Sequence, residues 1–161
     1  MGGFVGSDET KKEFIEDKVN KWVEKIKILT SIANEHPHEA FSAFSRSLQA
    51  EWNFILRVVP GAAEIMERVE KEIGGNFLPS LIDNPICENE RLLMSLPARK
   101  GGLGIANPCM CQDVHAASFE ASEMIVKSIL HAENDFDIYE HRHQVKETRN
   151  KYRKKKIQMM I

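Results

Sequence analysis

Apolar residues recur along the first third of this chain at intervals of four and three positions, which is the spacing of one helix face. The members of this face are Ile15, Val19, Trp22, Ile26, Leu29 and Ala33. Ser7 is a suitable N-cap before it, and Asp8 and Glu9 suit the first turn of a helix. Charged residues are assigned to the opposite face, namely Lys11, Lys18, Lys21, Glu24 and Lys25. The pattern predicts a long helix that packs on a core.

Two more helices are predicted before residue 75. Pro37 suits the first turn of one, and Pro60 with Gly61 ends it. The aromatic-rich face of that helix consists of Phe41, Phe44, Leu48, Trp52, Ile55 and Val59. The next helix has an apolar side made of Ala62, Ile65, Met66, Val69 and Ile73. Gly74 and Gly75 are expected to end it in a left-handed cap.

The remaining pattern is also helical. Core side chains are expected around Pro79, namely Phe77, Leu78, Leu81 and Ile82. Helices are predicted over residues 88–96, about 112–131 and 137–156, while residues 2–6 form a short β-like segment. We therefore expect an all-α single domain of about six helices with a glycine-rich loop. Its boundaries are 1–135 for the helical domain and 136–161 for a basic C-terminal helix or tail.

The loop is the segment SLPARKGGLGIANP, residues 95–108. Three glycines fall within four positions there, and glycine allows positive φ or close backbone approach. These structural positions are Gly101, Gly102 and Gly104. Leu103 and Ile105 are expected to anchor the loop on a core, and Arg99 and Lys100 stand at its entrance as candidate nucleic-acid contacts.

This tract, preceded by ENERLLMS, resembles a segment that follows the polymerase core in reverse transcriptases of non-long-terminal-repeat retrotransposons. Three further blocks resemble the same family in the same order. They are GGFVGSDETKKEFIEDKVNKWVEKI, HPHEAFSAFSRSLQAEWNFILRVVP and the run 113–129. The resemblance covers nearly the whole chain, from residue 2 to about 156, and it implies the thumb and post-palm region of an RNA-directed DNA polymerase.

The resemblance places the metal-binding aspartates of such polymerases before residue 1. The sequence has no Tyr-x-Asp-Asp and no Asp-Asp pair, whereas two-metal phosphoryl transfer needs converging carboxylates. Gly-x-Ser-x-Gly, Walker and His-Glu-x-x-His motifs are also missing. We therefore expect no enzyme activity, no catalytic residue and no cofactor. The implied partner is a template–primer duplex of RNA or DNA.

Charge is concentrated at the C-terminal end. The chain has 22 basic and 24 acidic side chains, for a net charge of −2, yet eight basic residues stand against Glu147 alone in residues 142–156. The eight are Arg142, Lys146, Arg149, Lys151, Arg153, Lys154, Lys155 and Lys156. Such a segment suits a phosphate backbone, and Tyr152 can stack on a base. The alternatives are a solvated helix and a nuclear localisation signal.

The three cysteines do not indicate a disulfide framework, because their number is odd. Cys109, Cys111 and His115 have the spacing Cys-x-Cys-x3-His, but zinc usually takes four ligands and the second pair is missing. We therefore expect no metal. Cysteine usage favours an intracellular setting, cytoplasmic or nuclear.

No apolar run approaches the roughly 20 residues that a membrane-spanning helix needs, so we expect no membrane partner. The alternative to nucleic-acid binding is a structural or protein-interaction domain. Such a domain would be a homo-oligomer through an exposed apolar face made of Phe41, Phe44 and Trp52.

Overall fold

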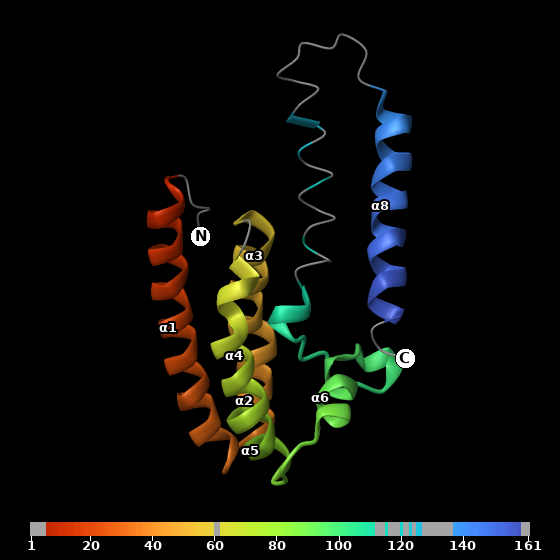
Figure 1. The fold of residues 1–161 in the computed structure, drawn as a ribbon. Coiled ribbons are helices and arrows are strands. Elements are labelled where there is room, and N and C mark those ends of the chain that lie inside the picture. Colours follow the sequence, from red (N-terminus) through yellow and green to blue (C-terminus); the bar gives the residue numbers. More distant parts are fainter. Residues whose placement is uncertain are drawn as a thin grey trace. The chain divides into compact units, whose positions relative to one another are not determined.

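The computed structural model describes residues 6–59, 62–111 and 137–158, together with the single positions 115, 120, 123, 125 and 126. Every regular element in these parts of the chain is helical, which confirms the all-α prediction (Figure 1). The chain divides into two compact units, residues 1–111 and 112–161. This division falls earlier than the boundary at 135 that the composition indicates. The β-like segment lies outside the described residues except for Gly6.

Helix α1 (Asp8–Ala33) has the start and the face that its sequence predicts. The backbone N–H of Thr10 donates to the Ser7 hydroxyl oxygen at 3.4 Å, which is an N-cap contact. Five of the six predicted core residues are buried, and Leu29 packs partly buried against the same core. The apolar spacing alone therefore identifies which side of α1 packs inward.

The second predicted helix is continuous over residues 37–58, but it contains a π-helical turn. It comprises α2 (Pro37–Ala43), the π turn Phe44–Leu48 and α3 (Gln49–Val58). The N–H of Gln49 reaches the carbonyl of Phe44 five residues back, which closes the π turn. Phe44 and Trp52 are completely buried, and Phe41 is half-buried. The apolar face proposed for self-association is therefore not exposed, and that prediction is wrong for these residues.

Gly74 and Gly75 do not end the third helix, so this prediction is also wrong. The chain continues from α4 (Glu67–Glu72) through a second π turn, Ile73–Phe77, into α5 (Leu78–Ile82). Pro79 explains the widened turn, because a proline ring collides with the carbonyl four residues back in an α-helix. The N–H of Leu78 bonds instead to the carbonyl of Ile73. The left-handed residue that ends the helix is Asp83, with φ of 54°.

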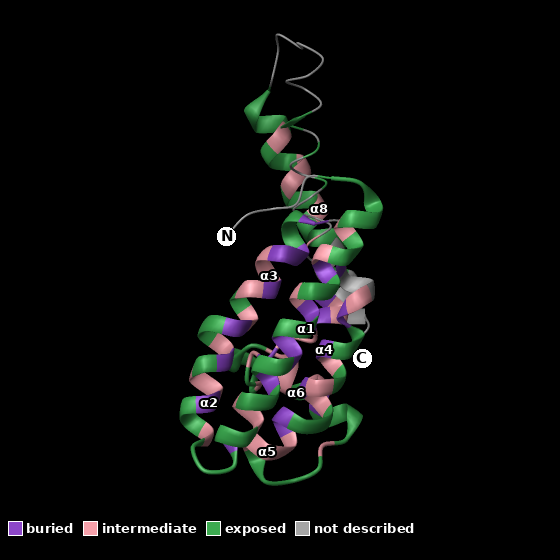
Figure 2. Cartoon of the chain, turned by 90° about the vertical axis from the view of Figure 1, so that its left-hand side faces the viewer, coloured by how far each residue is buried: buried purple, intermediate pink, exposed green. Residues whose placement is uncertain are grey.

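The core of the first unit lies between α1 and these two long helices. Helix α1 packs against α2, α4 and α5. Trp52 meets the rings of Trp22 and Phe44 edge-on at centroid distances of 6.0 and 5.4 Å, and Phe44 stacks on Phe77 at 4.6 Å. In the long helices of the first unit, buried positions lie on one side and exposed positions on the other (Figure 2). The aromatic residues that the sequence pattern selects thus form the centre of the unit.

Two more elements follow the predicted ranges. Helix α6 (Glu88–Ser95) precedes the glycine-rich loop in the first unit, and α8 (Ile138–Gln158) belongs to the second. Asp137 caps α8, since its carboxylate accepts the N–H of Tyr139 at 2.8 Å. The helix predicted over 112–131 falls mostly outside the described residues. Among the helices of the described ranges, none is both long and apolar enough to cross a bilayer.

Candidate functional site

The glycine-rich loop folds back on the end of α6, and its three glycines meet two geometric requirements. Gly101 and Gly104 have φ of 83° and 71°, the left-handed region that other residues avoid. A Cβ on Gly102 would overlap the carbonyl oxygen of Leu96 and stand 2.6 Å from that of Leu93. The N–H of Gly104 donates to the Leu96 carbonyl at 2.8 Å. The loop therefore has two positions that favour glycine by their φ and one where a side chain does not fit.

One side chain of α3 attaches this loop to the core. The Gln49 amide nitrogen donates to the Gly104 carbonyl at 3.1 Å, and its amide oxygen accepts the Ala106 N–H at 3.0 Å. Ile105, between these two contacts, is completely buried, whereas Leu103 is 38% exposed. Ile105 is thus the predicted anchor, and Leu103 is not. Gln49 supplies the polar half of the attachment.

A buried ion pair attaches α6 to α4 next to the loop. Arg91 donates through Nε and Nη2 to the two carboxylate oxygens of Glu70, both at 2.7 Å, and through Nη1 to the Ile105 carbonyl at 2.8 Å. Arg91 is 9% exposed. Burial raises the pKa of Glu70, although the paired Arg91 acts in the opposite direction. The pair holds the loop in place, and the sequence pattern did not identify it.

The two cysteines that follow the loop are at least partly buried, which lowers their reactivity. Cys111 is buried and Cys109 is half-buried. Burial, together with the negative charges of Glu70 and Glu67, raises the pKa of the Cys109 thiol to about 11. Such a thiol is a weak nucleophile at neutral pH. Among the described residues, which include His115, no three metal-binding side chains come together.

The two basic residues of the loop lie on its outer side. Arg99 and Lys100 are exposed in a short 3₁₀ turn, Ala98–Lys100, which is closed by a hydrogen bond from the Gly101 N–H to the Ala98 carbonyl at 2.9 Å. These residues belong to the first unit, whereas the basic segment from residue 142 belongs to the second.

Helix α8 sorts its described basic side chains onto two faces. A helix turns by about 100° per residue, so positions four and seven apart share a face. Arg142, Lys146 and Arg149 follow this spacing and are all exposed, and the sequence continues it with Arg153 and Lys156. Lys151 and Lys154 lie on the other side, as do the acids Glu140 and Glu147. We call Arg142, Lys146 and Arg149 the α8 basic face.

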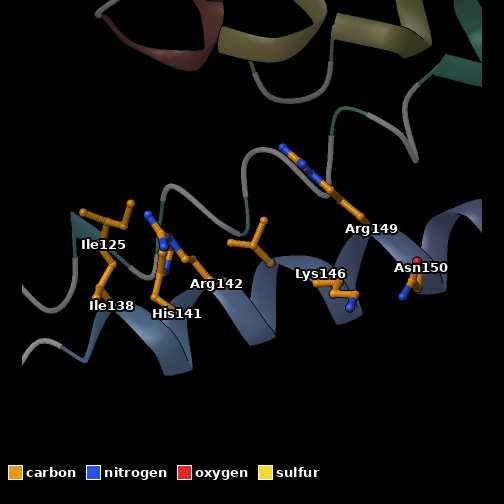
Figure 3. Close-up of a pocket in the computed structure, with 8 residues that line it drawn as sticks. Ile125, Ile138, His141, Arg142, Lys146, Arg149 and Asn150 are labelled. Carbon is orange, nitrogen blue, oxygen red and sulfur yellow. The ribbon is translucent and has the colours of Figure 1, made fainter.

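The α8 basic face borders a hollow of about 790 Å³ in the second unit (Figure 3). Ile138, Val145 and Ile125 supply its apolar lining, and Ile125 lies beside Ile138. Arg142 and Arg149 extend from the same side of the helix. The hollow is therefore lined by both cationic and apolar side chains. The side chains of Arg153, Lys155 and Lys156, also predicted as contacts, lie outside the described ones.

Comparison with known proteins finds no matching family model, no matching curated protein and no matching solved structure.

Proposed function

We propose that this chain is a non-catalytic helical module that binds the sugar–phosphate backbone of nucleic acid through the α8 basic face. The observation that carries the proposal is the segregation of charge on α8. Arg142, Lys146 and Arg149 share one face, while Glu140 and Glu147 lie on the other. A solvated helix needs no such sorting, whereas a helix laid along a polyanion does.

The dimensions of the face support this ligand. From Arg142 to Arg149 the helix rises by about 10 Å, so the three cations follow one another along the axis every 5 Å or so. A nucleic-acid strand offers a phosphate at roughly every 3.4 Å of its axis, so successive cations can reach phosphates of one strand. Contacts of this kind give affinity without sequence specificity.

The resemblance of the sequence to the post-palm region of reverse transcriptases supports the same ligand. That region follows the polymerase core, and this chain carries none of the aspartate motifs of that core. We propose that an RNA–DNA hybrid is bound and not processed. Arg99 and Lys100, exposed on the glycine-rich loop of the other unit, are proposed as secondary backbone contacts.

The test compares two double variants with the unchanged full chain. Lys146→Gln/Arg149→Gln removes two charges from the α8 basic face, and Lys151→Gln/Lys154→Gln removes two with the same three-residue spacing from the other side. Anisotropy with a labelled RNA–DNA hybrid is measured over a salt series. We expect the first variant to reduce the salt slope by about 2 and the affinity at 0.1 M salt by roughly 60-fold.

The matched control variant should lose much less, although the two variants have the same net charge. Equal losses in both variants would mean that only overall charge matters, which contradicts a defined face. If the unchanged chain shows no binding at low salt, the proposal fails and a protein-interaction or structural domain is the better interpretation.

A further inference from the structure

The first unit contains a second cationic hollow, on the outer side of α1 and α3. It has a volume of about 680 Å³, within the usual range of ligand pockets. Its lining includes Lys18, Trp22, Lys25, Arg46, Glu51 and Phe54. We call these six residues the α1–α3 groove. Lys18 is four residues before Trp22 and Lys25 is three residues after it, so both lie on the same side of α1 as Trp22. The prediction that these two lysines lie on the face opposite Trp22 is therefore wrong.

One wall of the groove is a fixed polar network. Glu51 accepts the indole N–H of Trp22 at 2.9 Å and the ammonium of Lys25 at 2.9 and 3.1 Å. Burial by itself raises the pKa of Glu51, but the hydrogen bonds from Lys25 and Trp22 outweigh it, so the pKa lies below its ordinary value. The Glu51 carboxylate therefore remains ionised, and Lys25 balances its charge.

Two cations of the groove are left for a ligand. Lys18 and Arg46 form no ion pair with any of the described residues, although Lys18 acts on Glu51 from a longer distance. The ammonium of Lys18 lies 5.6 Å from the ring centre of Phe14, which restricts its position. Three cations against one carboxylate give the groove a net charge of two positive units. The groove is therefore suited to an anion.

An aromatic ring accompanies these charges. Phe54 is half-buried and lines the same hollow, one turn after the Arg46–Ala50 stretch of the helix. Single-stranded nucleic acid is bound by such a combination, in which cations follow the phosphates and aromatic rings stack on the bases. A peptide of acidic residues alone offers the charge but has no planar ring to stack on Phe54.

We infer that the α1–α3 groove binds single-stranded nucleic acid, with phosphates at Lys18 and Arg46 and a base on Phe54. The nature of the ligand rests on the proposed function, whereas the site is distinct from the α8 basic face and belongs to the other unit. The two sites can therefore be inactivated separately.

The chain provides its own probe for this groove. It has two tryptophans, so its indole N–H groups give two nitrogen–proton NMR signals. The Trp22 indole N–H donates a hydrogen bond to Glu51 in the groove. The indole nitrogen of Trp52 is buried, with no acceptor among the described residues. Trp52 therefore reports on the integrity of the core, and Trp22 reports on ligand in the groove.

The experiment titrates the labelled full chain with an eight-residue oligothymidylate at low salt. We expect the Trp22 signal to move and the Trp52 signal to stay. Lys18→Gln/Arg46→Gln should abolish the movement and reduce the affinity at 0.1 M salt by about 25-fold, from two single-strand phosphate contacts. The matched control is Lys12→Gln/Lys71→Gln, which removes two exposed lysines outside the groove. This variant should retain both the movement of the Trp22 signal and the affinity.

The outcomes separate this inference from the proposed function. In Lys146→Gln/Arg149→Gln the Trp22 signal should still move, because the groove is intact. If oligothymidylate binds the unchanged chain and the Trp22 signal stays still, the groove inference fails while binding through α8 stands. If a polyglutamate peptide moves the Trp22 signal and oligothymidylate does not, the groove is a protein site and the inference also fails.

Discussion

At the scale of single residues, Arg91 has the most demanding position in the first unit. Its guanidinium satisfies both oxygens of the half-buried Glu70 carboxylate and one backbone carbonyl of the loop, that of Ile105. The mutual attraction of such a pair is largely offset by the cost of removing both charges from water. The pair therefore matters most when one partner is lost and the other charge stays buried.

We expect Arg91→Met to reduce the free energy of unfolding by roughly 2 kcal/mol, because the half-buried Glu70 carboxylate then loses its cation. The measurement is urea denaturation at pH 7. The double variant Arg91→Met/Glu70→Met, which removes both charges, should recover most of the loss. A single variant that loses less than about 1 kcal/mol would show that the Glu70 carboxylate reaches water and that the pair does not hold the loop.

At the scale of elements, two π turns determine how the long helices meet. Each turn adds one residue to the local helical repeat, and this changes the direction in which the following side chains point. Phe44 begins the first turn and Phe77 ends the second, and their rings stack at a centroid distance of 4.6 Å. The turns are therefore part of the core packing. In the third helix, the turn Ile73–Phe77 also accommodates Pro79.

Substitution of glycine by alanine should have opposite effects on stability in the helix and in the loop. A Cβ on Gly75 meets nothing within 4 Å, and its φ is not positive, so Gly75→Ala should raise the free energy of unfolding by about 0.5–1 kcal/mol. A Cβ on Gly102 would overlap rigid backbone, so Gly102→Ala should lower it by about 2 kcal/mol. Denaturant unfolding of both variants measures the two effects. A destabilised Gly75→Ala would contradict an uninterrupted helix through this position.

Helical periodicity predicts the helices of this protein better than it predicts where they end and which residues connect them. The buried face of α1 can be predicted from the spacing of its apolar residues, because residues three or four positions apart lie on the same side of a helix. Gly74 and Gly75 mislead, because the requirement of Pro79 for a wider turn outweighs the usual role of glycine as a helix end. The pair Arg91–Glu70 and the contact of Gln49 with Gly104 join distant parts of the chain, so no local pattern indicates them.

The candidate sites show the same division. The α8 basic face is predictable, because it depends only on charge and helical spacing along one element. The α1–α3 groove is not, because it depends on which side chains of α1 and α3 meet. Lys18 and Lys25 are ordinary surface charges in the sequence. Only the packing of the two helices places them around Glu51 and Phe54.

At the scale of the whole molecule, the proposed binding of nucleic acid would use two separate cationic sites. The net charge of −2 opposes general attraction to a polyanion, so affinity must come from local cationic sites. The α1–α3 groove lies in one compact unit and the α8 basic face in the other. Because both sites are on one chain, occupation of the first makes binding at the second an intramolecular step.

This arrangement predicts a step in affinity as the nucleic acid becomes longer. Oligothymidylates that reach only one site should bind weakly, and those that reach both should bind about 100-fold more tightly, since the second contact is made at a high effective concentration. Anisotropy with strands of 4–40 nucleotides measures the step at a fixed salt concentration. Lys18→Gln/Arg46→Gln and Lys146→Gln/Arg149→Gln should each remove the step, although each leaves one site intact. A smooth rise with length that both variants retain would mean that the sites do not act on the same strand.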